Sequence, residues 1–224
     1  MKILMFVLFV SQILFAQDFI VQKVSGNVFV QKGFEEKTQK VNTGDKLKSN
    51  DLIITDESAF IHLKDKNGNS FVLKSNSAVG VNYLRKMSLN DLILALTQEE
   101  IRTVPRNSNK TPNTAVYGTE ARMKKPFDFQ NKLGQKKING AKQLAESGFV
   151  ESAILAAKET FRKYPATGKN FGDRLYFADL VKNLGLDEES ISEYNKISKI
   201  AETDAQKEIL SNRIEGVNLK IIRN

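Results

Sequence analysis

The sequence predicts an α+β protein in which a β-sandwich or β-roll is followed by α-helical hairpins. Two patterns support this fold class. From Asp18 to Leu84, apolar residues tend to alternate with polar ones, a period of two that is typical of strands with one buried face. From about Leu133 onward, apolar residues recur instead with the spacing of an amphipathic helix. We therefore expect an N-terminal β-region and a C-terminal helical region.

An apolar leader precedes the β-region. Met1 and Lys2 are followed by a nearly unbroken apolar run, Ile3 to Phe15, and Ala16 is a small residue suited to signal peptidase. The run of about 13 residues is shorter than the roughly 20 that a membrane-spanning helix needs. We expect residues 1–16 to be a signal peptide removed between Ala16 and Gln17, with no transmembrane segment left in the mature chain. The alternative is a short uncleaved anchor.

Composition narrows the range of partners and chemistry. The 224 residues include 34 basic and 26 acidic side chains, a formal charge of +8, and loss of Lys2 with the leader would leave +8 − 1 = +7. The basic residues are scattered, as on a solvated surface, although contact with an anionic envelope polymer or lipid is an alternative. Nucleic acid is not an expected partner. Because cysteine is absent, disulfides, thiolate metal sites and a lipoprotein anchor are excluded.

Turn signals separate the predicted strands. Asn67-Gly68 lies between two alternating runs and predicts a two-residue type I′ hairpin turn, in which both residues adopt positive φ. The spacing of turns and apolar residues resembles the FecR domain. The residues that carry this resemblance are Val24, Gly26, Val28, Val41, Gly44, Asp45, Leu47, Asp51, Ile53, Thr55, Ser58, Ala59, Leu63, Asp65 and Gly68.

The FecR resemblance covers about residues 20–83 and implies a periplasmic β-fold. It extends to Thr119 if Thr111-Pro112 and Gly118-Thr119 close the domain. The best-known family members are transmembrane regulators that receive a signal from an outer-membrane receptor and control a sigma factor. Here only two residues precede the apolar leader, so we do not expect an anti-sigma mechanism, although a role elsewhere in a FecR-type signalling pathway stays an alternative.

A helix is predicted within this first domain, over residues 88–104. Ser88 is suited to the N-cap and Asp91 to the first turn, while Leu92 and Leu96 share one helical face. We expect this helix to pack on the β-domain, with a membrane-surface or partner-binding role as the alternative. The predicted β-domain therefore spans residues 17–119, and a basic connector spans residues 120–132.

For the C-terminal region, residues 133–224, the sequence predicts two helical hairpins and a final helix. Ala141 corresponds to Ala178, and Ala153 corresponds to Ser190, both at an offset of 37 residues. A glycine turn between helices, with small residues where the helices cross, resembles the tetratricopeptide repeat family. That resemblance implies a concave groove for a partner segment. The alternative is a packing spacer without a ligand, and in either case we expect the helices to lean on the β-domain.

No catalytic, cofactor-binding or metal-binding residues are predicted. His62 is the only histidine, and alternation places it on the polar side of its strand. The segment Asp65–Asn69 looks like the start of a calcium loop but lacks the later glutamate, so it is expected to be a turn. The sequence favours a non-enzymatic, periplasmic or secreted envelope protein that binds or scaffolds an envelope protein or polymer. Alternatives are a peptidoglycan- or anionic-glycan-binding module and an enzyme.

Export is directly testable. When the full chain is produced in a bacterium with a periplasm, we expect the intact mass of the product to correspond to a chain that begins at Gln17, because Ala16 completes the cleavage site. A product in the membrane fraction that retains residues 1–16 would contradict this expectation.

Overall fold

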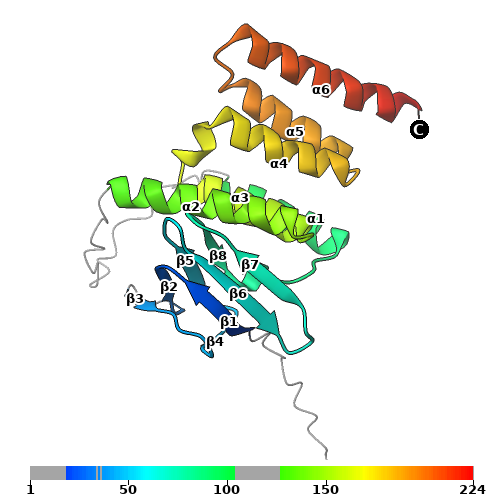
Figure 1. The fold of residues 1–224 in the computed structure, drawn as a ribbon. Helices are drawn as coiled ribbons and strands as arrows, with labels where there is room; N and C mark the ends of the chain where they lie inside the picture. Colours follow the sequence, from blue (N-terminus) through cyan, green and yellow to red (C-terminus); the bar gives the residue numbers. More distant parts are fainter. Residues whose placement is uncertain (1–18, 34, 36, 104–126, 224) are drawn as a thin grey trace, which may run out of the picture.

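The computed structural model describes residues 19–33, 35, 37–103 and 127–223, so the expected cleavage site at Ala16 and Gln17 lies outside the described residues. The protein is α+β, as the sequence predicts, with strands first and α-helices after them (Figure 1). The strands are β1 (Phe19–Ser25), β2 (Val28–Gln31), β3 (Thr38–Lys40), β4 (Lys46–Leu47), β5 (Leu52–Thr55), β6 (Phe60–Asp65), β7 (Ser70–Leu73) and β8 (Ala78–Gly80). The helices are the 3₁₀ turns η1 (Val81–Tyr83) and η2 (Thr167–Lys169), and α1 (Leu89–Thr103), α2 (Phe127–Glu146), α3 (Val150–Lys163), α4 (Phe171–Asn183), α5 (Asp187–Ser198) and α6 (Asp204–Arg223).

The strands form two antiparallel four-stranded sheets, in the orders β4-β1-β6-β7 and β3-β2-β5-β8. Within β6, Ile61, Leu63 and Asp65 are buried, whereas His62 is half-buried on the other face. Val28 and Val30 are the buried residues of β2. Alternating side chains from both sheets meet in one apolar core, so the period of two in the sequence correctly marks the buried faces.

The hairpin between β6 and β7 differs from the expected two-residue turn. Gly68 has a φ of +86°, but Asn67 is not among the non-glycine residues with positive φ, so the type I′ prediction was wrong. The amide of Gly68 donates to the carbonyl oxygen of Asp65 at 3.2 Å. The buried carboxylate of Asp65 also accepts hydrogen bonds from the amides of Asn67 (2.9 Å) and Asn69 (2.8 Å). Asp65 thus organises a longer turn through its side chain, a local interaction that the Asn-Gly pair does not reveal.

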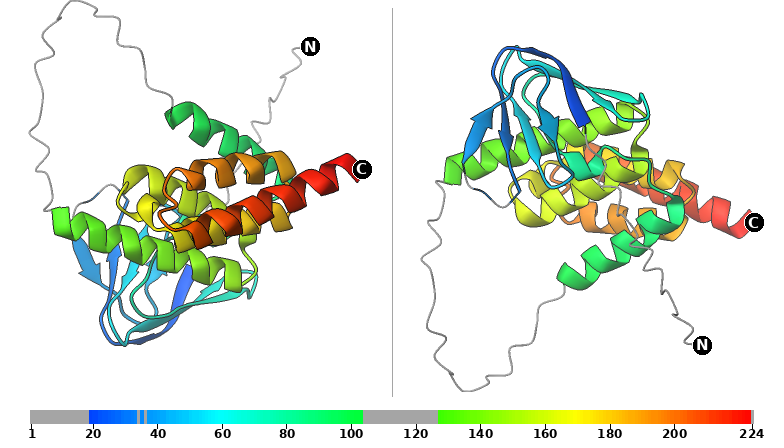
Figure 2. Two further views of the ribbon diagram at one scale, coloured as in Figure 1. Left: turned by 90° about the horizontal axis from the view of Figure 1, so that it is seen from above. Right: turned by 90° about the horizontal axis from the view of Figure 1, so that it is seen from below.

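The helices form a stack that rises from the sheets, with α2 and α3 nearest to the sheets and α6 farthest away (Figures 1 and 2). Helix α2 begins at Phe127, so the last part of the connector proposed for residues 120–132 is helical, and residues 120–126 lie outside the described part. Gly148 and Gly185, both with positive φ, end the first helix of each hairpin. The predicted glycine breaks therefore lie at the two tight turns.

Helix α1 confirms the helix predicted over residues 88–104, and Ser88 caps it. The hydroxyl of Ser88 accepts a hydrogen bond from the amide of Asp91 at 3.1 Å. The sequence predicts that this helix packs on the β-domain, and that prediction was wrong for its buried side chains, because Leu92 and Leu96 pack on the helical half. Their core neighbours there are Ile154, Val181 and Leu186.

Helix α2 lies directly against β8 at Gly140. A Cβ atom at this glycine would be 2.2 Å from the carbonyl oxygen of Ala78 and 2.6 Å from Cγ2 of Val79, so only glycine fits. Ile138, Ala141 and Leu144 of α2 are consequently part of the same apolar core as the strands. The two halves share one core and do not form independent units.

Polar groups along α2 pair with the segment that leads into β8. The side-chain oxygen of Gln143 accepts a hydrogen bond from the Lys74 amide at 2.7 Å, and its nitrogen donates to Ser77 Oγ at 2.6 Å. Asn139 donates to the carbonyl oxygen of Asn76 at 2.9 Å. Lys136 donates to the carbonyl oxygen of Thr55 at 2.9 Å and forms an ion pair with Asp56. These bonds fix the direction in which α2 crosses the sheet edge.

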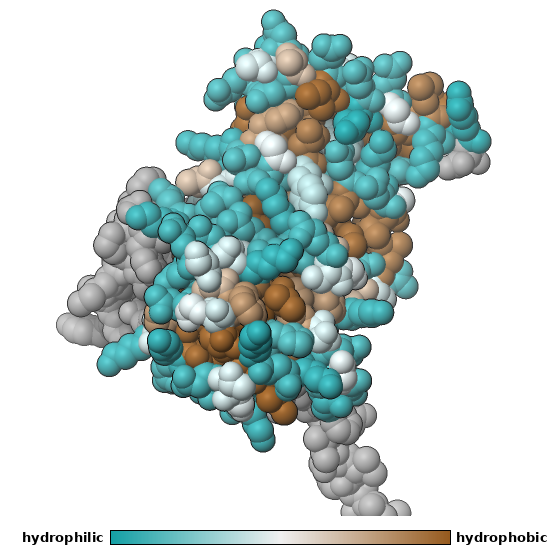
Figure 3. All heavy atoms as spheres, in the orientation of Figure 1, coloured by the Kyte–Doolittle hydropathy of each residue, from teal (hydrophilic) through white to brown (hydrophobic). Residues whose placement is uncertain are grey.

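Within the described part of the chain, no helix combines the length and the hydropathy needed to cross a bilayer. The surface seen in Figure 3 is mainly hydrophilic, with apolar patches between the polar side chains. Leu94 and Ile101 on α1, and Ile222 near the end of α6, are the large apolar side chains that are most exposed. Isolated exposed apolar residues of this kind are normal on soluble domains and by themselves assign no role.

The contact at Gly140 gives a stability prediction. We expect Gly140→Ala to lower the free energy of unfolding by about 1–3 kcal/mol, because the added methyl group forces α2 away from β8. Chemical denaturation measures this loss. As a matched control, Gly216→Ala on α6 adds a methyl group with no atom within 4 Å of it, and should raise stability by up to about 1 kcal/mol through helix propensity. Equal effects of the two substitutions would contradict the close packing of α2 on β8.

Candidate ligand-binding clefts

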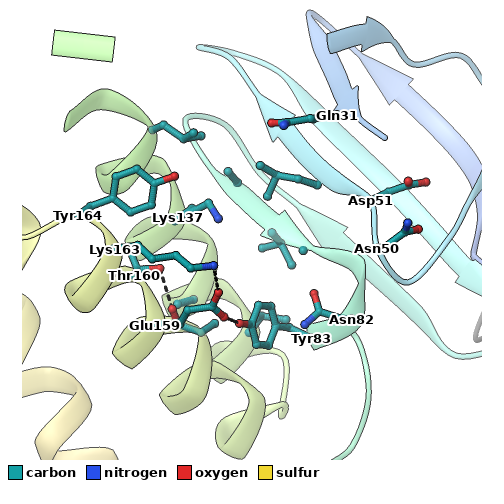
Figure 4. Close-up of a pocket in the computed structure, with 18 of the residues that line it drawn as sticks. Gln31, Asn50, Asp51, Asn82, Tyr83, Lys137, Glu159, Thr160, Lys163 and Tyr164 are labelled. Carbon is teal, nitrogen blue, oxygen red and sulfur yellow. Dashed lines mark hydrogen bonds and ion pairs between the residues drawn. The ribbon is translucent and has the colours of Figure 1, made fainter. Parts of the chain in front are cut away.

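A cleft of about 510 Å³ lies between the β-region and helices α2 and α3. We call it the junction cleft; Figure 4 shows its lining. Its volume is within the range of roughly 300–1,000 Å³ that small-molecule sites occupy. The polar residues that line it are Gln31, Asn50, Asp51, Asn82, Tyr83, Lys137, Glu159, Thr160, Lys163 and Tyr164. The cleft exists because α2 and α3 are held against the edge of the sheet that contains β8.

The β-side of the junction cleft presents amide groups. Asp51 is buried, and its carboxylate accepts hydrogen bonds from the amides of Lys48 (2.9 Å) and Gly33 (3.3 Å), so it stabilises the turn. Gln31 donates to the carbonyl oxygen of Glu35 at 2.6 Å. The carboxamides of Asn50 and Asn82 complete this wall. Carboxamides of this type both donate and accept hydrogen bonds, which suits hydroxyl-bearing ligands.

The helical side carries the charges. The carboxylate of Glu159 accepts hydrogen bonds from the hydroxyl of Tyr83 and from Nζ of Lys163 (Figure 4). Burial raises the pKa of Glu159, but these two hydrogen bonds outweigh it and lower the pKa below its ordinary value. For Tyr83, burial and then the Glu159 charge raise the pKa, so the phenol stays protonated and donates. Glu159 is therefore an ionised group whose charge is already compensated.

Lys137 is the remaining cation of this wall. Its side chain is half-buried, and Nζ lies 5.7 Å from the centroid of the Tyr164 ring. Among the described residues, no carboxylate forms an ion pair with it. Burial, followed by repulsion from Lys163, lowers the pKa of Lys137, while Glu159 opposes this shift. The lysine points into the cleft (Figure 4).

A second concavity, of about 480 Å³, lies between α1, α3, α4 and α5. We call it the helical cleft. It is lined by four cationic side chains, Lys158, Arg162, Arg174 and Lys196, and by five acidic ones, Glu99, Glu100, Glu188, Glu189 and Glu193. The predominance of charge is unlike a typical apolar ligand pocket.

Glu193 is the centre of the ion pairs in the helical cleft. It is buried and pairs with Lys158, with Arg174 at 3.1 Å and with Lys196 at 3.0 Å. Burial raises its pKa, but the charge and hydrogen bond of Lys158, with help from Lys196 and Arg174, lower the pKa to about 2. A buried carboxylate that is surrounded by cations in this way stays ionised.

Two further pairs tie α1 to this centre. Glu99 is buried and accepts a hydrogen bond from Nε of Arg162 at 2.6 Å. Glu100 pairs with Lys196 at 2.7 Å. Each of the four cations lining the cleft thus has a carboxylate partner, whereas Glu188 and Glu189 line the cleft and form no ion pair with another described residue.

The acidic pairs Glu99-Glu100 and Glu188-Glu189 occupy adjacent helical positions, which predicts that the two members of a pair point to different faces, yet all four line the helical cleft. The sequence indicated no binding role for the other polar residues of either cleft. His62, which it did consider, lies on the outward face of β6, opposite Lys23 of β1 and Val72 of β7, and lines neither cleft. Asp65 serves a turn, as expected. Within the described residues, no group of three or more histidine, cysteine or acidic side chains is placed to hold a metal ion. Lys136 and Lys137 are among the scattered basic residues of the sequence, yet Lys136 forms an ion pair with Asp56 and Lys137 lines the junction cleft.

Comparisons of the chain with protein-family models, with curated proteins and with solved structures gave no match. The geometry of the two clefts is therefore the basis on which a function can be proposed.

The ion-pair centre predicts an acid-sensitive fold. The folded-state pKa of Glu193, about 2, is below its ordinary value of 4.5. The unfolded chain therefore binds the proton more readily, and the stability that this group contributes is lost as the pH falls from about 5 toward 2. We expect a loss on the order of 2–3 kcal/mol. Urea denaturation at pH 6 and pH 3 measures it, and Glu193→Gln should reduce the difference between the two pH values.

The control for this prediction is Glu215→Gln on the exposed surface of α6, which also removes one carboxylate and should leave the pH dependence of stability unchanged. If Glu193→Gln unfolds the chain at both pH values, Lys196→Met offers a second variant, because loss of one cation should make the acid-induced loss of stability smaller. A pH dependence that is identical in wild type, Glu193→Gln and Lys196→Met would contradict the role of Glu193.

Proposed function

We propose that the protein is an exported, non-catalytic scaffold of the bacterial cell envelope, located in the periplasm or outside the cell. In this proposal the β-region is a FecR-like sandwich and the helices are tetratricopeptide-like hairpins. The helical half holds a segment of a protein partner, and the β-region carries it rigidly. The wide charged helical cleft is the observation that supports a binding role most strongly.

Helical packing supports the proposed repeat. Ala141 on α2 and Ala178 on α4, the equivalent positions of the two hairpins, are each at most 2% exposed. Ala153 on α3 and Ser190 on α5, the second equivalent pair, are fully buried. Small side chains at matching helix crossings allow close approach of the paired helices, which is the reason that the repeat family needs them.

The charge of the helical cleft indicates the kind of segment that it would take. Its cations are already engaged by Glu99, Glu100 and Glu193, so an acidic partner would have to break existing pairs. Glu188 is exposed at the N-terminus of α5, and Glu189 is half-buried beside it. A partner segment with lysine or arginine residues would pair with these two carboxylates and leave the network intact.

A second candidate function is the binding of an anionic envelope glycan. The positive formal charge of the chain, +8, favours attraction to a polyanion. The specific observation that favours it is Lys137, a cation that lines the junction cleft without a carboxylate partner among the described residues.

The scaffold proposal is tested with the whole mature chain, because the two halves share a core. The chain is immobilised and used to capture proteins from an envelope extract, which are quantified by mass spectrometry. We expect a captured protein whose recovery falls at least about tenfold when Glu188→Gln and Glu189→Gln are combined, as expected when two charge pairs are lost together.

The matched control combines Glu202→Gln and Glu208→Gln. Both residues are exposed, and the double variant has the same change in net charge. Recovery that falls equally in both double variants would indicate non-specific charge attraction, and the absence of any reproducible captured protein would contradict the scaffold proposal.

A further inference from the structure

The junction cleft contains one cation, Lys137, that forms no ion pair with a carboxylate among the described residues. Lys163 is paired with Glu159, and Lys136, the neighbour of Lys137 in the chain, is paired with Asp56 outside the cleft. The Nζ of Lys137 lies 5.7 Å from the centroid of the Tyr164 ring and is attracted by the more distant charge of Glu159. A cation–π contact stabilises an ammonium group by about 0.5–2 kcal/mol but satisfies few of its three hydrogen-bond donors.

The partial burial of Lys137 makes this arrangement costly without a ligand. The half-buried ammonium group is less well solvated here than in water, and this burial lowers the pKa of the lysine although Glu159 opposes the shift. An anion that entered the cleft would restore the lost solvation and would itself gain a charge-assisted hydrogen bond. The cleft therefore favours a ligand with one negative group over a neutral ligand.

The rest of the lining selects for hydroxyl groups near that negative group. Asn50 and Asn82 present carboxamides from the β-side, and Tyr164 presents a phenol from the helical side (Figure 4). Burial and the charge of Glu159 raise the pKa of Tyr164, so its hydroxyl stays protonated and can donate. Paired donors and acceptors of this kind match vicinal sugar hydroxyls.

We infer that the junction cleft binds the acidic end of an envelope glycan, with Lys137 pairing with the carboxylate of a sugar acid and Asn50, Asn82 and Tyr164 bonding to its hydroxyls. The cleft volume of about 510 Å³ has room for a small saccharide. The inference deepens the second candidate function and does not depend on the protein partner proposed for the helical cleft.

A sugar acid fits this cleft better than the carboxylate end of a peptide does. Peptide sites combine their charged anchor with apolar pockets for side chains. Of the apolar residues that line the junction cleft, Ala141, Leu144 and Val79 are buried in the shared core, whereas Leu52 and Leu133 are half-buried. The polar part of the surface left for a ligand is larger than the apolar part and consists of amide, phenol, hydroxyl and charged groups.

The test uses digalacturonate as the probe and the full mature chain in 0.15 M salt, where long-range attraction between surface charges is screened beyond roughly 8 Å. Isothermal titration calorimetry should show saturable binding. Lys137→Gln should weaken it at least about tenfold, while Lys137→Arg, which keeps the charge, should retain most of it. A neutral digalactoside should bind at least about tenfold more weakly than digalacturonate.

The matched control is Lys199→Gln, which removes one charge from an exposed lysine at the end of α5 and should leave the affinity unchanged. Wild-type protein also serves as an internal check, because the backbone amide signals of Asn82 and Tyr164 in an NMR titration should shift with digalacturonate. This measurement keeps the inference testable if Lys137→Gln does not fold.

Four outcomes would overturn the inference. If digalacturonate does not bind, the inference that the cleft binds sugar acids is wrong. If Lys137→Gln and Lys199→Gln lower the affinity for digalacturonate equally, the ligand is attracted by surface charge in general. That result would contradict binding in the junction cleft but would leave the glycan-binding function open. Inorganic phosphate that binds through Lys137 as tightly as digalacturonate would show a simple anion site. NMR shifts confined to other parts of the chain would place the glycan elsewhere.

Discussion

The close approach of α2 to β8 at Gly140 is the contact on which the rest of the molecule depends. Because no side chain separates the helix from the carbonyl oxygen of Ala78, the apolar face of α2 enters the core of the strands. An alanine in this position would already overlap with the strand backbone. Because Gly140 has no side chain, α2 can pack closely on β8, and the β-region and the helical region share one hydrophobic core.

This contact also explains where the junction cleft lies. The core seals one side of the interface through Ile138, Ala141 and Leu144. Near Tyr164 and Asn50, polar side chains from the helices and from the β-region line the junction cleft. The interface between α2, α3 and the strands is apolar in its centre and polar at its rim, so the charged groups at the rim are partly solvated. Lys137 is one of these groups, whereas its neighbour Lys136 pairs with Asp56, so adjacent lysines on one helix have different surroundings.

The helical cleft shows a different balance. Its buried carboxylate Glu193 is surrounded by three cations, and α1 adds Glu99 and Glu100 to the same network. Buried ion pairs of this kind contribute less net stability than their number implies, because desolvation opposes the attraction. They do define the position of α1 relative to α3 and α5, since removal of one partner leaves an uncompensated buried charge. The apolar contacts of Leu92 and Leu96 attach α1, and the ion pairs orient it.

The sequence alone determined the local features of this protein. Alternation of residues such as Ile61, His62 and Leu63 marked the buried strand faces, and the glycines at 148 and 185 marked the breaks between helices, because both patterns depend on neighbours within a few residues. The same local rules placed the helix that begins after Ser88. They gave the α+β class and the order of its two regions, but they placed the start of α2 six residues late and misjudged the turn at Asn67-Gly68.

Only the tertiary structure decided which helix faces which partner. Nothing within a few residues of Gly140 indicates that a strand lies against it. Nor does the local sequence indicate that Glu99 and Glu193 pair with cations from α3 and α4. Nor does the pair Lys136-Lys137 reveal that one lysine meets Asp56 and the other faces a cleft. The physical reason is that burial, ion pairing and cleft shape depend on contacts between segments separated by tens of residues. Periodicity along the chain does not predict which of these distant segments contact each other.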